Sequence, residues 1–294
     1  MSVFDIEGYL DSLPENITSI NLNSKDITYL PDISRFTNLR TLSCSNNSLT
    51  ALPPLPKTLK NLHCFNNELI CLPNLPKNLE NLYCKGNYLT SLPTLPDTLQ
   101  VLSCFCNQIT SLPTLPTKLI KIHCGSNRIT YLPPLPANLV KLFCENNMLI
   151  LLPALPETLQ DLTCYNNQLT SLPILHENLK SLYCYRNQLS SLPNLPENLE
   201  RIDFVQNPIT EIIRYDNLST LKQQIQKLNR IRYTYYCQKY KPQFRKWLWE
   251  KIREPKFLKT YHPKYLFEYL FELYLFDENA IVDIAILDMV LSEW

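Results

Sequence analysis

Residues 39–58 read LRTLSCSNNSLTALPPLPKT, and the chain repeats this stretch at a spacing of twenty for most of its length. The dipeptide Leu-Pro begins at residue 52 and returns at 72, 92, 112, 132, 152, 172 and 192. A fixed period of this length is typical of stacked-repeat proteins, because one short unit cannot bury its own apolar side chains. The period therefore predicts a solenoid.

Several columns of the unit L-x-x-L-x-C-x-x-N-x-L-x-x-L-P-x-L-P-x-x hardly vary from copy to copy. The cysteine column runs in eight copies from Cys44 to Cys184 and becomes Phe204 in the ninth. The asparagine column runs without a gap from Asn47 to Asn207. We expect each asparagine amide to bond backbone groups that the turn after the strand leaves unpaired.

This pattern resembles the leucine-rich repeat family, whose signature is L-x-x-L-x-L-x-x-N-x-L. The Leu-Pro-x-Leu-Pro variant is similar to the repeats of bacterial secreted effectors and of leucine-rich repeat proteins from giant DNA viruses (mimivirus-like). Cysteine in place of the third leucine, with filler rich in Asn and Tyr, favours the viral kind. The resemblance covers about residues 17–212, including a degenerate first copy with Lys25 in the asparagine column.

The resemblance implies a parallel β-sheet on the concave side, with partners binding there. Each L-x-C segment supplies one short strand, and adjacent strands pair about 4.8 Å apart. The two proline columns favour an extended, polyproline-like convex side with almost no helix. We expect three parts: an N-terminal cap (1–16), a solenoid of about ten repeats (17–213) and a helical C-terminal cap or tail (214–294).

Helical spacing of apolar residues marks both ends of the chain. Residues 3–12 predict a short capping helix, and an apolar stripe from Leu218 to Ile231 predicts a helix over about 218–240. We expect three prolines to divide the remainder into shorter helices. These prolines are Pro242, Pro255 and Pro263, and the helices are 243–253, 264–276 and 278–292.

The eleven cysteines allow a metal or redox column as one interpretation. Cysteines that point inward along one line cannot surround an ion tetrahedrally, as zinc requires. We therefore interpret the column as small buried hydrophobic side chains. Cys71, Cys106 and Cys237 lie outside the column and are expected to be free thiols.

The positions that flank the cysteine column are predicted to face solvent on the concave side. Seven aromatic residues and two histidines fall in these eighteen positions, and aromatic residues are favoured at interface centres. The alternative is that aromatic side chains simply suit strands. The candidate partner-binding residues are His63, Phe65, Tyr83, Lys85, Phe105, His123, Phe143, Glu145, Tyr165, Tyr183, Tyr185 and Arg186.

Charge is segregated in the tail. Residues 214–264 carry fourteen Lys and Arg against three acids, whereas residues 265–294 carry seven acids and no Lys or Arg. The basic stretch, with interleaved aromatic residues, could bind nucleic acid or anionic lipid. The alternative, which we favour, is that basic helices pack on acidic ones and cap the last repeat. Acidic residues interrupt 265–291 too often for a transmembrane helix.

The sequence contains no phosphate-binding loop, zinc-binding motif or nucleophile elbow. Similar bacterial effectors often carry a ubiquitin-ligase domain with a Cys-x-Asp nucleophile, but Cys237 is followed by Gln238 and Lys239. We therefore expect a non-catalytic interaction module without a cofactor or metal, with a ligase-like effector or adaptor as an alternative. The N-terminus shows no signal-peptide pattern, so an intracellular, cytoplasmic location is expected, in the host cytoplasm if the protein is viral.

Overall fold

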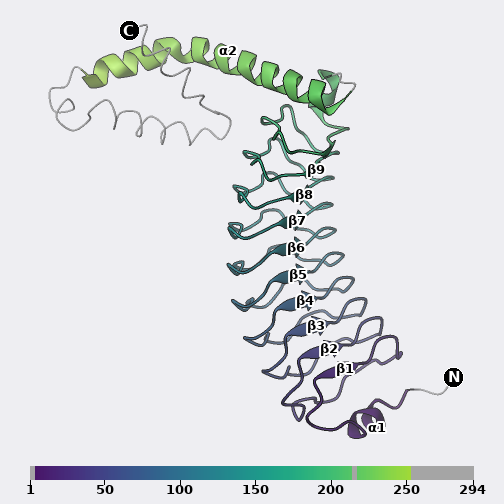
Figure 1. Cartoon of the computed structure of the whole chain (residues 1–294). Coiled ribbons are helices and arrows are strands. Elements are labelled where there is room, and N and C mark those ends of the chain that lie inside the picture. Colours follow the sequence, from purple (N-terminus) through teal and green to yellow (C-terminus); the bar gives the residue numbers. More distant parts are fainter. Residues whose placement is uncertain (1–3, 214–216, 253–294) are drawn as a thin grey trace. The chain divides into compact units, whose positions relative to one another are not determined.

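The computed structural model describes residues 4–213 and 217–252 (Figure 1). Two compact units divide the chain, Met1–Arg214 and Tyr215–Trp294. The first unit holds all ten described strands, and the described part of the second unit is one long helix. None of the described helices is long and apolar enough to cross a membrane.

Ten strands of three residues each form one parallel sheet, in which spatial order follows sequence order. Figure 1 shows them as a ladder of short arrows with a loop on either side. The strands are β1 (Ser19–Asn21), β2 (Thr41–Ser43), β3 (Asn61–His63), β4 (Asn81–Tyr83), β5 (Val101–Ser103), β6 (Lys121–His123), β7 (Lys141–Phe143), β8 (Asp161–Thr163), β9 (Ser181–Tyr183) and β10 (Arg201–Asp203). The predicted parallel solenoid is confirmed.

Equivalent residues of successive repeats pair directly, as Leu42 does with Leu62. Backbone bonding continues beyond the strands: Cys44 N–H donates to His63 O at 2.8 Å, and Asn46 N–H donates to Phe65 O at 2.9 Å. Strands this short persist because each repeat is bonded along its turn as well as along its strand. Every column of the sequence therefore becomes a row of identical positions along the solenoid.

The cysteine column lies in the core, directly after each strand. All eight of its members, from Cys44 to Cys184, are fully buried free thiols. Burial raises the pKa of the Cys44 thiol to about 12, and burial with the neighbouring Cys44 raises the pKa of Cys64 well above its ordinary value. These thiols fill volume as hydrophobic side chains, which confirms the interpretation made from the sequence.

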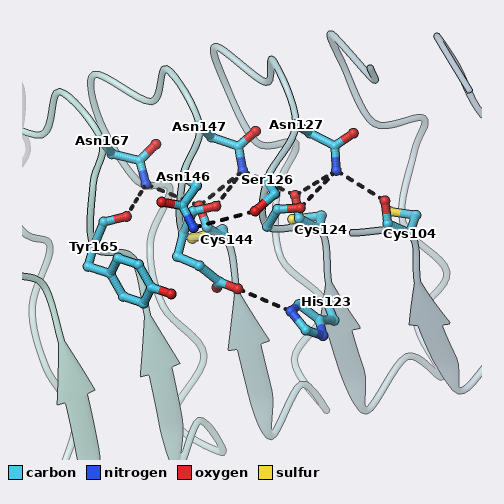
Figure 2. A network of polar contacts seen from close by, with 12 residues as sticks. Cys104, His123, Cys124, Ser126, Asn127, Cys144, Asn146, Asn147, Tyr165 and Asn167 are labelled. Atoms are coloured by element: carbon cyan, nitrogen blue, oxygen red, sulfur yellow. Dashed lines mark hydrogen bonds and ion pairs between the residues drawn. The ribbon is translucent and has the colours of Figure 1, made fainter. Parts of the chain in front are cut away.

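The asparagine column closes each turn with four polar contacts. Asn87 Nδ2 donates to Cys64 O and to Cys84 O, both at 3.0 Å, and more weakly to Lys85 O at 3.3 Å. Its Oδ1 accepts the backbone N–H of Leu69 at 3.0 Å. Figure 2 shows the same arrangement for Asn127, Asn147 and Asn167. Each amide thus joins two repeats, and the predicted role of this column is confirmed.

The residue before each of these asparagines has a left-handed backbone conformation. Its φ lies between 52° and 62° in every copy from Asn46 to Gln206. Gly and Asn tolerate this conformation best, yet Cys106 and Arg186 also adopt it. At these two positions the stack therefore imposes a turn that the residue itself does not favour.

The side opposite the strands has no helix anywhere between Ser12 and Asn207. The Leu-Pro-x-Leu-Pro segments form neither helix nor strand, as the prolines predict. Polar side chains tie these segments to the preceding repeat, since Thr58 Oγ1 donates to Thr37 O at 2.9 Å and to Leu39 O at 2.8 Å.

The predicted capping helix is α1 (Ile6–Asp11), and Asp5 caps its N-terminus by accepting the N–H of Gly8 at 3.0 Å. A short 3₁₀ helix, η1 (Pro208–Glu211), follows β10. In the second unit, α2 (Leu218–Ile252) starts where the sequence predicts, with Asn217 accepting the N–H of Thr220 at 3.0 Å.

The prediction that Pro242 ends this helix is wrong, because α2 continues through it to Ile252. Proline removes one backbone hydrogen bond and disfavours the helix interior by about 3 kcal/mol, which a helix with several turns on both sides can absorb. The separate helix expected over 243–253 is therefore largely part of α2. The helices expected at 264–276 and 278–292 lie outside the described residues.

Candidate partner-binding face

The strand residues on either side of the buried middle position, together with the residue two positions after each strand, form one outward surface, here called the sheet face. All twelve candidate residues lie on it or, for Arg186, directly beside it. Ten are half-buried, Glu145 is buried, and Arg186 is exposed. Most of them contact a candidate of a neighbouring repeat, because the columns stack them one repeat apart.

Two ring stacks include a histidine. His63 lies parallel to Tyr83 with 4.6 Å between centroids, and Phe105 lies parallel to His123 at 4.2 Å. His123 also meets Phe143 at 5.3 Å in a tilted arrangement. Burial lowers the pKa of His63, so its neutral form is favoured on the stack.

Lys85 lies between two phenylalanine rings. Its Nζ is 5.0 Å from the centroid of Phe65 and 5.3 Å from that of Phe105. Each position is within the range of a cation–π interaction, and two rings hold the ammonium group at one place on the sheet face. The run Phe65, Lys85, Phe105, His123, Phe143 is continuous across five strands.

Glu145 interrupts this regularity. Gly125 has no side chain, and the carboxylate of Glu145 occupies the space where a side chain at Gly125 would lie. One carboxylate oxygen, Oε1, is 3.1 Å from Nε2 of His123, a contact drawn in Figure 2. The other, Oε2, is buried and has no hydrogen-bond partner among the described residues. Glu145 thus lies between the run from Phe65 to Phe143, here called the larger cluster, and a second aromatic cluster on the following repeats.

The second cluster contains Tyr165 and Tyr185, which stack with 4.3 Å between centroids. Burial, with Tyr165 beside it, raises the pKa of Tyr185. Tyr183 stands between Thr163 and Asp203 in the sheet register, so its column offers it no neighbouring ring. Arg186 Nε donates to Gln206 Oε1 at 2.6 Å. Ten of the twelve candidates thus contact at least one other candidate, and the two that do not are Tyr183 and Arg186.

Sequence reasoning omitted one residue of the larger cluster. Lys121 Nζ lies 5.5 Å from the Phe143 centroid. Lys121 and His123 are two positions apart on β6, so their side chains leave the same side of the sheet. This strand alternation could have placed Lys121 on the sheet face from the sequence alone. Nearby, Lys141 pairs with Asp161 at 2.8 Å and Lys60 with Glu80 at 2.6 Å.

Within residues 4–213 and 217–252, no group of three or more His, Cys, Asp or Glu side chains could hold a metal ion. The sheet face instead offers rings, ammonium groups and one buried carboxylate. These groups suit binding to another molecule through stacking and charge.

No protein-family model matches the sequence, and no curated protein does. Solved structures do. YopM from Yersinia enterocolitica is 33% identical in sequence, and its structure matches with a TM-score of 0.59; the match covers 67% of this chain and 48% of that YopM chain. YopM from Yersinia pestis, a leucine-rich effector protein, is 33% identical with a TM-score of 0.57, and the match covers 65% of this chain and 61% of that YopM chain.

Two further structures extend the likeness. The functional domain of InlJ from Listeria monocytogenes, which includes a cysteine ladder, is 27% identical with a TM-score of 0.55, covering 65% of this chain and 49% of its own. The ectodomain of the Arabidopsis thaliana receptor kinase GASSHO1/SCHENGEN3, solved in complex with CASPARIAN STRIP INTEGRITY FACTOR 2, is 25% identical with a TM-score of 0.51, covering 67% and 28%. This chain spans less than two thirds of each of these structures. It has the leucine-rich repeat fold with repeats of the effector length.

Proposed function

We propose that this leucine-rich repeat solenoid is a non-catalytic module that binds a protein partner on its sheet face, the predicted concave side. The observation that carries the proposal is the continuous run of rings from Phe65 to Phe143 around Lys85. Leucine-rich repeat proteins are interaction modules, and bacterial effectors are among them.

A rigid support makes these rings suitable for binding. Each ring projects from a strand or turn that is bonded to both neighbouring repeats, so little conformational freedom is lost when a partner docks. Aromatic side chains contribute large contact areas and dominate interface energetics. The eight free thiols of the core support a reducing, intracellular setting, and a host protein is the proposed partner if the source is a virus or a pathogen. The viral likeness itself stays a prediction.

A comparison of two triple variants tests the proposal. The first changes Tyr83, Phe143 and Tyr183 to Ala on the sheet face. The matched control changes three exposed apolar side chains away from the strands, Tyr88, Tyr131 and Ile174, to Ala. We expect affinity capture from host-cell extract to lose its specific partners with the first variant and keep them with the control. Unaltered recovery with the first variant would reject the sheet face as the binding surface.

A second candidate function belongs to α2. Tyr235, Tyr236 and Tyr240 are exposed, and Lys239 Nζ lies 5.9 Å and 5.4 Å from the rings of Tyr235 and Tyr240. Residues 218–241 also contain six Lys and Arg and no acid. Exposed rings among basic side chains suit single-stranded nucleic acid or an anionic lipid surface. Affinity for RNA, DNA and anionic vesicles as a function of salt tests this function, and absence of binding at low ionic strength rejects it.

A further inference from the structure

We infer that the sheet face takes an acidic segment of its partner, held by Lys85 and Lys121 between the rings of the larger cluster. This inference rests on the proposed function and names the chemistry of the partner.

Along β3 to β7, the four lysines of the sheet face and of the column directly before the strands fall into two classes. Lys60 and Lys141 are neutralised by Glu80 and Asp161. In contrast, neither Lys85 nor Lys121 has a carboxylate partner among the ion pairs of the described residues. Their ammonium groups lie over aromatic rings instead.

The surrounding sheet face offers these two lysines no acid. Along β3 to β7 and the residue two positions after each strand, the single acidic residue is Glu145. Its carboxylate is buried and paired with His123, on the far side of the Phe105 ring from Lys85. This part of the face therefore carries positive charge that a partner can neutralise, although residues 1–213 as a whole have 14 basic and 17 acidic residues. Electrostatic complementarity of this local kind sets partner choice and docking register.

The rings make the two lysines better anchors than ordinary surface lysines. An exposed lysine gains little from an ion pair, because it must give up side-chain freedom and hydration. Two phenylalanine rings already restrict Lys85 and remove part of its water. A carboxylate that reaches Lys85 or Lys121 meets a pre-positioned donor beside an apolar surface.

The geometry also limits the length of the segment. Four contacts join the ammonium groups through Phe105, His123 and Phe143, with separations of 5.3, 4.2, 5.3 and 5.5 Å. The two charges are therefore no more than about 20 Å apart, a span that about six extended residues cover. Acidic residues alternating with aromatic or aliphatic ones match the alternation of ammonium groups and rings.

The test uses the full chain and two labelled peptides. The first is an eight-residue peptide in which Glu alternates with Tyr, and the second replaces each Glu by Gln. We expect fluorescence anisotropy at low salt to show tighter binding of the Glu peptide to the wild-type chain. Changing Lys85 and Lys121 together to Gln should weaken that binding by about tenfold, because two charge-assisted contacts are lost. The Lys85→Arg, Lys121→Arg variant keeps both charges and should retain most of the affinity.

Two controls separate the sheet face from the basic tail. Lys57→Gln with Lys118→Gln removes the same charge from exposed positions outside the strands, and its binding should match the wild type. Carbodiimide cross-linking with mass spectrometry then locates the peptide, which should couple to Lys85 and Lys121. Three outcomes would each overturn the inference. They are cross-links confined to residues 222–264, equal binding of the Glu and Gln peptides, and equal affinity of the Lys85/Lys121 and Lys57/Lys118 double variants for the Glu peptide. The proposed function would survive those outcomes if the aromatic triple variant still lost its captured partners.

Discussion

Replacing Asn87 by Ala provides the sharpest test of how the repeats are held together. Asn87 is buried, and its amide satisfies Leu69 N–H, Cys64 O and Cys84 O at 3.0 Å each. Alanine leaves the N–H of Leu69 buried without an acceptor and removes one donor from each carbonyl. An orphaned buried donor costs about 1–3 kcal/mol, and the two carbonyls add to it.

We therefore expect a loss of about 3 kcal/mol in the free energy of unfolding, more than a hundredfold in the folding equilibrium constant. Urea unfolding followed by circular dichroism measures this loss, provided the transition slope is unchanged. Hydrogen exchange gives the local readout, because the Leu69 amide should lose protection before its neighbours. Asn78→Ala is the matched control: Asn78 Nδ2 makes an exposed bond to Lys57 O at 3.1 Å, and its loss should change stability by less than about 0.5 kcal/mol.

Asn87→Asp adds a pH-dependent version of the same test. A carboxylate at this position faces two carbonyl oxygens, which raises its pKa in the folded state above its value in the unfolded chain. Relative to the wild type, this variant should therefore gain stability as the pH falls through the raised pKa, because only the protonated form can donate to a carbonyl. An Asn87→Ala loss no larger than that of Asn78→Ala, with Leu69 exchange unaltered, would refute the role assigned to this column.

Three further predictions concern other columns. Cys71 and Cys106 should react with a thiol reagent in the native protein, whereas the eight ladder thiols, buried and with raised pKa, should react only after unfolding; modification of ladder cysteines under native conditions would contradict the structure. Gly86→Ala should lower stability by about 1–2 kcal/mol, because the site is left-handed and a methyl group there would collide with the Asn66 side chain. Cys106→Gly, at an equivalent left-handed site, should not lower stability. Equal melting temperatures for Gly86→Ala and the wild type would exclude this strain. Burial lowers the pKa of His63, so its contribution to stability is complete above its unfolded pKa of about 6.5 and is lost as the pH falls through the folded value. His63→Phe keeps a ring on Tyr83 and should flatten this part of the stability–pH profile. An unchanged profile would argue against a role for His63 in it.

Much of the fold could be predicted from the period because the solenoid is quasi-one-dimensional. Residues twenty apart become neighbours, so a column in the sequence is already a row in space, as Leu42 and Leu62 show. The burial of the Cys44 column and the bonding of the Asn87 column follow from this same rule. Placement of the twelve candidate residues on or beside one face follows from strand alternation.

The period does not determine how neighbouring side chains arrange themselves. Which lysine lies over which ring depends on rotamers and on the identity of side chains in adjacent repeats, so the position of Lys85 between Phe65 and Phe105 required the structure. The same holds for Glu145, whose carboxylate occupies the space above Gly125 because that one position has no side chain.

Some features of the backbone conformation could likewise be predicted from the sequence, and others required the structure. The repeat predicted the strands and the helix-free proline segments, since those follow from local residue types. The left-handed turn at Cys106 and Arg186 and the passage of α2 through Pro242 oppose local preference. Sequence alone determined the stack and the columns exposed on it. Tertiary structure decided where local preference is overruled, because hydrogen bonds between repeats outweigh the strain of one residue, and a long helix outlasts one missing bond.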